Sequence, residues 1–132
     1  MSKKLRIFVF IFSLLIIIIA IGAIAVSSIQ TNLDNLKNAE LNDLGLSVVP
    51  DGTYYGEYSA FPVSVEVSVT ILNHEIQSIE IFKHDNGQGA PAEVIIDTVI
   101  EEQSVQVDTV AGATYSSYCI LLAIQDAIDL GD

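Results

Sequence analysis

The sequence predicts an α+β fold: a small antiparallel sheet with helices packed on one side, preceded by one N-terminal transmembrane helix. Residues 63–71 alternate apolar and polar side chains, as a strand with one buried face does. Segments 91–103 and 115–130 carry apolar residues at helical spacing, and residues 7–26 contain no charged residue. The order expected for the domain is β-β-β-α-β-α.

Three more strands are expected around the alternating segment. "DGTYYGEY" (51–58) places a turn pair before aromatic and β-prone residues, which predicts the first strand. Asn73 and His74 separate the alternating segment from "EIQSIEIF" (75–82), as the turn of a β-hairpin does. "SVQVDTV" (104–110) is rich in β-branched residues and predicts a short strand before the last helix.

The N-terminal segment predicts a membrane anchor. Residues 7–26 have only Ser13 as a polar side chain, and about 20 such residues match the thickness of a bilayer core. A cleaved secretory signal is the alternative, but its apolar region usually has only about 7–15 residues. Basic residues stand in segment 1–6, before the span, so the N-terminus is expected in the cytoplasm. The protein is then a single-pass protein of the cell membrane, with its C-terminal domain outside the cytoplasm.

Residues 27–50 are expected to form a juxtamembrane helical stalk or linker, and residues 51–132 the domain. Leu33, Leu36 and Leu44 recur at approximately helical spacing among polar residues. Whether the stalk packs against the domain or against a second copy is left open by the sequence.

Charge and cysteine content exclude several functions. Only Lys37 and Lys83 of the five basic residues follow the apolar segment, with all 17 acidic residues, so that part has a formal charge of −15. Nucleic acid is therefore not an expected partner. The single Cys119 cannot form an internal disulfide and is read as a small buried hydrophobe. The sequence has no haem-attachment motif and no metal-ligand spacing of Cys and His.

The stretch "VDTVAGATYSS" (107–117) is the candidate site. If the chain turns there from an extended segment into a helix, free N–H groups of the first turn point toward Thr114, Ser116 and Ser117 and favour a phosphate. Gly112 allows close approach, and Ala113 keeps the position small. Taken alone, the same residues are also explained as a helix cap after a turn.

The surrounding sequence resembles a known family. From Asp51 to about Ile128 the chain is similar to the FMN-binding domain of extracytoplasmic flavoproteins, found in respiratory-complex C and G subunits and in Gram-positive extracellular electron-transfer proteins. The family signature is D-x-x-[S/T/A]-G-A-T, followed by Ser or Thr. The matching residues are Asp108, Ala111, Gly112, Ala113 and Thr114, continued by Ser116 and Ser117. Ala111 stands where Ser or Thr is more usual.

The resemblance implies that the Thr114 hydroxyl carries FMN through a phosphoester. A separate magnesium-dependent flavin transferase, with FAD as donor, would attach it and would recognise Asp108 and the Gly-Ala step. The implied function is electron transfer from a membrane redox donor to an external acceptor, as a carrier rather than a stand-alone catalyst. His84, beside a glycine-rich loop, is a further candidate for contact with the flavin.

Two other functions stay open from the sequence. One is a flavin-free extracytoplasmic interaction or assembly module on the same fold. The other is an enzyme that reduces a small organic acceptor, although the chain has no room for the reductase domain to which related domains are fused.

Overall fold

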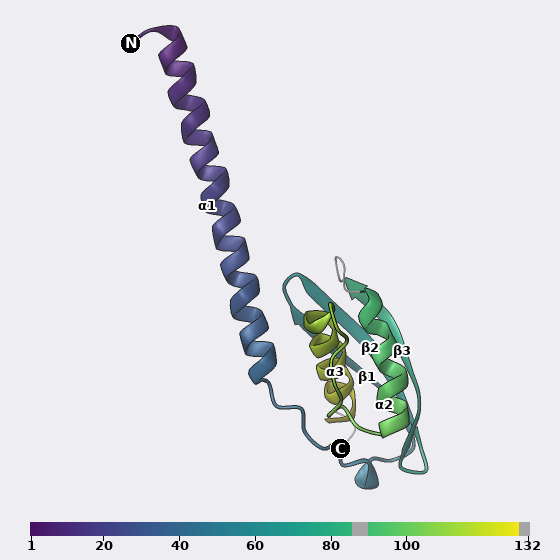
Figure 1. Ribbon diagram of the computed structural model, residues 1–132. Helices are drawn as coiled ribbons and strands as arrows, with labels where there is room; N and C mark the ends of the chain where they lie inside the picture. Colours follow the sequence, from purple (N-terminus) through teal and green to yellow (C-terminus); the bar gives the residue numbers. More distant parts are fainter. Residues whose placement is uncertain (86–89, 130–132) are drawn as a thin grey trace.

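The computed structural model describes residues 1–85 and 90–129 and has the predicted α+β architecture. A long N-terminal helix leads into a three-stranded antiparallel sheet of order β1-β2-β3, followed by two helices (Figure 1). In chain order the elements are α1 (Lys3–Asn38), the 3₁₀ turn η1 (Leu46–Val48), β1 (Gly52–Ala60), β2 (Val63–Leu72), β3 (Glu75–Asp85), the 3₁₀ turn η2 (Ala90–Val94), α2 (Ile95–Glu102) and α3 (Thr114–Asp129).

The sheet confirms the alternating pattern of β2. Its odd-numbered residues, from Val63 to Ile71, are all buried, whereas Glu66 on the other face is exposed. Asn73 and His74 form the β2–β3 turn with φ of 54° and 64°. Positive φ at both central residues is the geometry of a two-residue type I′ hairpin, which suits the right-handed twist of the strands.

Both C-terminal helices cover the same face of the sheet. Helix α3 packs across β1 and β2, and α2 lies along β3 (Figure 1). The approach of α3 to β1 is unusually close, because a Cβ placed on Gly56 would collide with the backbone of Ala123 and Ala127. A glycine at this strand position is therefore required by packing. The buried core joins β2, β3, α2 and α3, and partly buried residues of β1 pack against it. It includes Val65, Val67, Val69, Ile71, Ile76, Ile95, Val99, Ile120, Ile124 and Ile128.

The strand predicted at 104–110 does not form. These residues run as an irregular segment, although Val105 is fully buried. The edge of β3 is instead bonded by a side chain: Gln103 pairs with the backbone of Ile76. The segment predicted as one helix from Pro91 begins as the 3₁₀ turn η2 and becomes α-helical only at Ile95.

The stalk packs against the domain. Helix α1 continues past the apolar segment to Asn38, and the chain then runs without regular secondary structure to η1. Leu36, Leu44 and Val49 are 1%, 4% and 0% exposed and belong to the domain core. Of the two arrangements that the sequence left open, packing against the domain is the one the structure shows.

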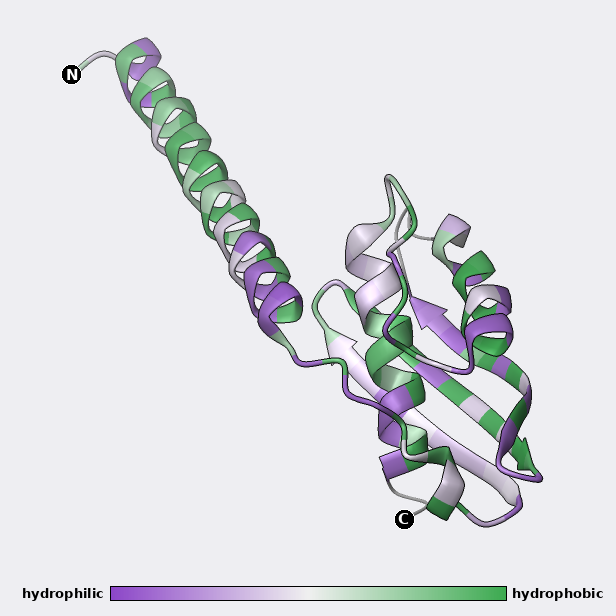
Figure 2. Cartoon of the chain, turned by 60° about the horizontal axis from the view of Figure 1, so that its bottom comes forward, coloured by the Kyte–Doolittle hydropathy of each residue, from purple (hydrophilic) through white to green (hydrophobic). Residues whose placement is uncertain are grey.

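The apolar part of α1 stands clear of the domain (Figure 2). Its most apolar 18-residue window has a mean hydropathy of 3.3, and none of that window is buried in the protein. A continuous apolar surface of this length matches the hydrocarbon core of a bilayer. The helix therefore supports membrane anchoring.

Candidate functional site

The candidate site begins with a tight turn. The N–H of Ala113 donates to the carbonyl of Val110 at 3.0 Å, which closes a β-turn. Gly112, the third residue of this turn, has φ of +78°. A type II turn requires positive φ at this position, so glycine is there for a backbone reason. The Gly-Ala step of the motif thus reverses the chain directly before α3.

Thr114 is the first residue of α3, and its side chain is partly exposed. Nothing lies within 4 Å of the point where Gly112 would carry a Cβ, so the space over the turn is open. The first N–H groups of a helix have no intrahelical partner and carry the positive end of the helix dipole. A phosphate joined to the Thr114 hydroxyl would therefore meet favourable electrostatics and no steric obstacle at Gly112.

Ser117 holds the turn against the helix. Its Oγ accepts from the N–H of Val110 at 3.0 Å and donates to the carbonyl of Ala113 at 2.7 Å. The side chain is fully buried, and Ser116 is only 2% exposed. Sequence reasoning had placed both serines among the cofactor-binding residues, a role that stays a prediction. It missed the structural role of Ser117, for which the signal is a serine four residues after the carbonyl it can bond.

The turn between β1 and β2 lies beside the start of α3. The Tyr115 hydroxyl donates to the carbonyl of Phe61, and Asn32 Nδ2 of the stalk donates to the same oxygen at 3.2 Å. Burial raises the pKa of the Tyr115 phenol, and a hydrogen bond with Asn32 partly offsets that effect. The stalk, the sheet and the motif helix are thus joined next to Thr114.

Asp108 lies on the rim of an open cavity next to the turn. The cavity has a volume of about 440 Å³ and is lined by α2 residues Thr98 and Glu102 and by the loop from Gln106 to Val110. The carboxylate of Asp108 therefore stands on the same loop as the turn, two residues before Val110. Its role in recognition by a transferase stays a prediction, as does that of Ala111, which is exposed at the turn.

His84 lies at the end of β3, where its Nδ1 is 3.0 Å from Glu93 Oε1 of η2. Its side chain is only 2% exposed. The turn η2 also contacts α3, so His84 belongs to the same end of the domain as the motif helix. The flavin contact proposed for His84 stays a prediction. Gly87 and Gly89 of the neighbouring loop lie outside the described residues.

Comparison with known protein families identifies the family of this chain. The model of the FMN-binding domain matches residues 61–129, just over half of the chain, and this range includes the whole motif from Asp108 to Ser117. The chain belongs to the FMN-binding domain family. The chain matches none of the curated proteins with which it was compared. Together with the apolar helix α1, membership of this family supports a membrane-anchored flavin-binding protein.

The residues present at the motif fit an FMN phosphate. Thr114 is a partly exposed residue at a helix N-terminus, and Gly112 leaves the approach open. Ser117 holds the turn through its hydrogen bond from the N–H of Val110. Within the described residues, no group of three or more His, Cys, Asp and Glu side chains could hold a metal ion. The helix N-terminus and the open space at Gly112 are what suit the site to a phosphate-bearing organic cofactor.

Proposed function

We propose that the protein is an extracytoplasmic electron carrier whose FMN is bound covalently to Thr114. The observation that carries this proposal is the position of Thr114: the residue is partly exposed, first in α3, and directly after a glycine turn over which the space is open. A cap residue has no need of that open approach. Membership of the FMN-binding domain family supplies the identity of the cofactor.

The attachment reaction is a phosphoryl-type transfer onto this chain. The Thr114 oxygen forms a bond to the FMN phosphorus of FAD, the bond between the two phosphates of FAD breaks, and AMP leaves. The hydroxyl proton passes to the transferase or to water, and no electrons are exchanged. The open space over Gly112 would admit the transferase, and Asp108, on the adjoining loop, would contribute to its recognition.

A covalent bond has a physical advantage outside the cell. A dissociable cofactor occupies its site only in proportion to its free concentration, which is negligible in an open medium. A phosphoester retains the cofactor irrespective of the binding constant. When bound, FMN supplies one- and two-electron redox chemistry, while the chain supplies the attachment point and the electrostatic surroundings.

The proposed topology follows from charge. Lys3, Lys4 and Arg6 precede the apolar part of α1, and the domain beyond it is strongly acidic. The positive-inside tendency places the basic end in the cytoplasm. The donor would then be a membrane redox protein or a membrane-soluble carrier, and the acceptor would lie outside the cytoplasm.

Intact mass spectrometry tests the proposal directly. The full chain, purified in detergent after co-production with a magnesium-dependent flavin transferase, should gain the mass of one FMN less one water and absorb visible light as a flavin. Thr114→Val should abolish both, because it removes the oxygen and keeps the shape. Thr109→Val, in the same loop, is the matched control and should be labelled like the wild type.

Two results would reject the proposal. Equal labelling of Thr114→Val and the wild type would place the flavin elsewhere. A folded wild-type chain that stays colourless with its unmodified mass, while a known substrate of the same transferase is labelled, would leave the interaction or assembly module as the remaining function.

A further inference from the structure

The face of the sheet opposite the helices carries an exposed aromatic pair. Tyr55 of β1 and Phe82 of β3 are 65% and 57% exposed, yet their rings are stacked with centroids 6.0 Å apart and planes 24° apart. The two rings reach toward each other across the intervening strand β2. Large apolar side chains grouped on an open face commonly mark an interaction site.

A shallow cavity adjoins this pair. It has a volume of about 270 Å³, opens to solvent, and is lined by both rings together with carboxylates from three elements. Glu57 comes from β1, Glu66 from β2 and Asp126 from α3. One oxygen of Asp126 accepts from the backbone N–H of Glu57 at 3.0 Å, which fixes that carboxylate at the edge of the cavity.

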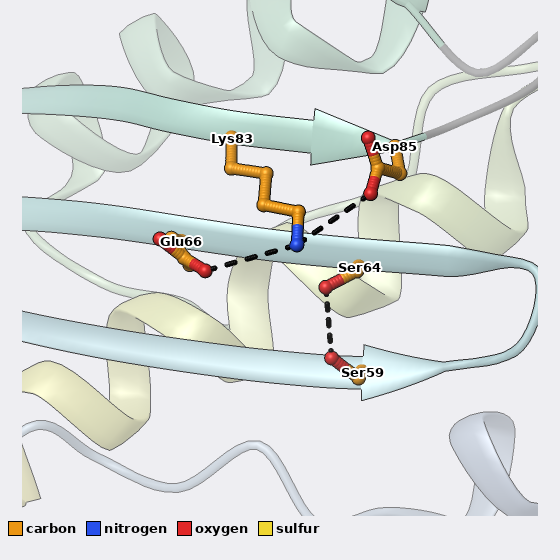
Figure 3. A network of polar contacts seen from close by, with 5 residues as sticks. All are labelled: Ser59, Ser64, Glu66, Lys83 and Asp85. Atoms are coloured by element: carbon orange, nitrogen blue, oxygen red, sulfur yellow. Dashed lines mark hydrogen bonds and ion pairs between the residues drawn. The ribbon is translucent and has the colours of Figure 1, made fainter.

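The surroundings of the cavity are acidic. Lys83 Nζ lies 3.9 Å from Glu66 and 3.6 Å from Asp85, so one ammonium is shared between two carboxylates (Figure 3). All three side chains are about half exposed or more, and the pairs are therefore readily rearranged by water or by a competing cation. Negative charge remains in excess around the two rings.

Aromatic faces combined with carboxylates select a planar cation. A guanidinium group stacks on an aromatic ring and pairs with a carboxylate in a bidentate geometry, whereas an ammonium is more strongly hydrated and has no plane to stack. We propose that this face is a docking surface for an arginine-bearing basic segment of a partner protein. The Tyr55–Phe82 pair would hold the guanidinium plane, and Glu66 would be its ionic partner. This surface is additional to the flavin function proposed above and does not depend on Thr114.

A second copy of this chain is the less suitable occupant. The part of the chain beyond the apolar segment has only two basic residues, neither of them an arginine, and a formal charge of −15. Two such faces would repel each other. The acidic field instead favours a basic partner and speeds its approach at low salt.

Binding of defined peptides tests the surface. The full chain in a neutral detergent is titrated with hexa-arginine and, separately, with hexa-lysine, by calorimetry at low and at physiological salt. Hexa-arginine should bind more tightly than hexa-lysine. Phe82→Ser and Tyr55→Ser should each weaken hexa-arginine binding by about 2- to 30-fold, the range of a cation–π contact, and Glu66→Gln should also weaken it.

Matched control variants distinguish binding at this surface from general attraction of the peptide to the negative charge of the domain. Leu72→Ser removes an exposed apolar side chain from the same strand as Glu66, and Glu101→Gln removes an exposed carboxylate from α2. Both should bind hexa-arginine like the wild type. Circular dichroism verifies that each variant is folded, and the three surface variants provide independent readings should one of them not fold.

Three results of the binding experiments would overturn the inference. They are equal binding of the two peptides, an equal loss for Glu101→Gln and Glu66→Gln, and no effect of either aromatic variant. A concentration-dependent dimer in sedimentation that Phe82→Ser abolishes would also overturn it, in favour of a second copy as the occupant.

Discussion

Gln103 makes with Ile76 both of the hydrogen bonds that a neighbouring β-strand would make. Its Nε2 donates to the Ile76 carbonyl at 3.0 Å, and its Oε1 accepts from the Ile76 N–H at 2.6 Å. Gln103 stands at the C-terminal cap of α2 with φ of 53°, a left-handed conformation. The backbone of Gln103 therefore ends the helix, while its side chain pairs a section of the edge of β3 and also donates to the Ile100 carbonyl of α2 at 2.7 Å.

Replacing this side chain should destabilise the domain. Gln103→Ala leaves the N–H and carbonyl of Ile76, which is 2% exposed, without their partners. Buried groups left unpaired cost about 1–3 kcal/mol each, so the free energy of unfolding should fall by about that amount or somewhat more. Urea unfolding followed by circular dichroism measures it. Gln106→Ala, which loses one bond to the Leu41 carbonyl at an exposed site, should cost less, and equal losses would contradict the pairing role.

Ser117→Ala should loosen the attachment turn. The variant leaves the N–H of Val110 unpaired in a part-buried position, which costs about 1–3 kcal/mol of stability. The turn before Thr114 would then sample other conformations, and flavin attachment by the transferase should slow. Ser59→Ala, which breaks an exposed bond to Ser64, should change stability by about 0.5 kcal/mol or less and leave the attachment rate unchanged. An unchanged rate in Ser117→Ala would show that the turn keeps its shape without this hydroxyl.

Cys119 should be inert in the folded protein. Burial raises the pKa of its thiol to about 12, an effect that a backbone hydrogen bond with Ala60 only partly offsets. The thiolate is the reactive form, so a thiol reagent at pH 8 should label the native protein far more slowly than the protein unfolded in urea. Fast labelling of the native protein would mean that this part of α3 opens readily.

The same shift makes stability depend on alkaline pH. The pKa is higher in the folded state than the ordinary value of 9.0, so the unfolded chain loses the thiol proton first. The contribution is fully present below about pH 9 and is lost as pH rises from there toward 12, at up to about 1.4 kcal/mol per pH unit. The Cys119→Ala substitution removes this pH-dependent contribution to the free energy of unfolding. The wild type should therefore lose stability more steeply than Cys119→Ala between pH 8 and pH 10, and parallel curves would refute the shift.

The sequence was most informative where one periodic signal determined the structure. The alternation along β2 and the Asn73–His74 turn were predicted correctly. The two shifts in the β2–β3 register, at Glu66/Val67 and at Thr70/Ile71, were not predicted. The α+β class and the long apolar helix were confirmed as well. The start of α3 at Thr114 was within one residue of the expected position.

The errors have a common physical origin in tertiary contacts. Residues 104–110 have the composition of a strand, but the edge of β3 near Ile76 is bonded by the Gln103 side chain, which no local pattern reveals. The packing of the stalk, which the sequence left open, also depends on tertiary structure, because Leu36 and Leu44 are buried in the core of the folded domain. At the site, the motif predicted where the turn and Thr114 lie. The motif did not show that the Ser117 hydroxyl holds that turn by hydrogen bonds to the backbone of Val110 and Ala113.

The hydrogen bonds that meet at the Phe61 carbonyl hold the start of α3 close to the apolar part of α1. Asn32 follows the last residue of the apolar stretch, Val26, by six helical residues, or about 9 Å of helix. Asn32 and Tyr115, the neighbour of Thr114, bond the same carbonyl oxygen. These two bonds connect the domain directly to α1. A flavin attached at Thr114, as proposed above, would therefore lie close to the bilayer surface, within reach of a donor embedded in the lipid.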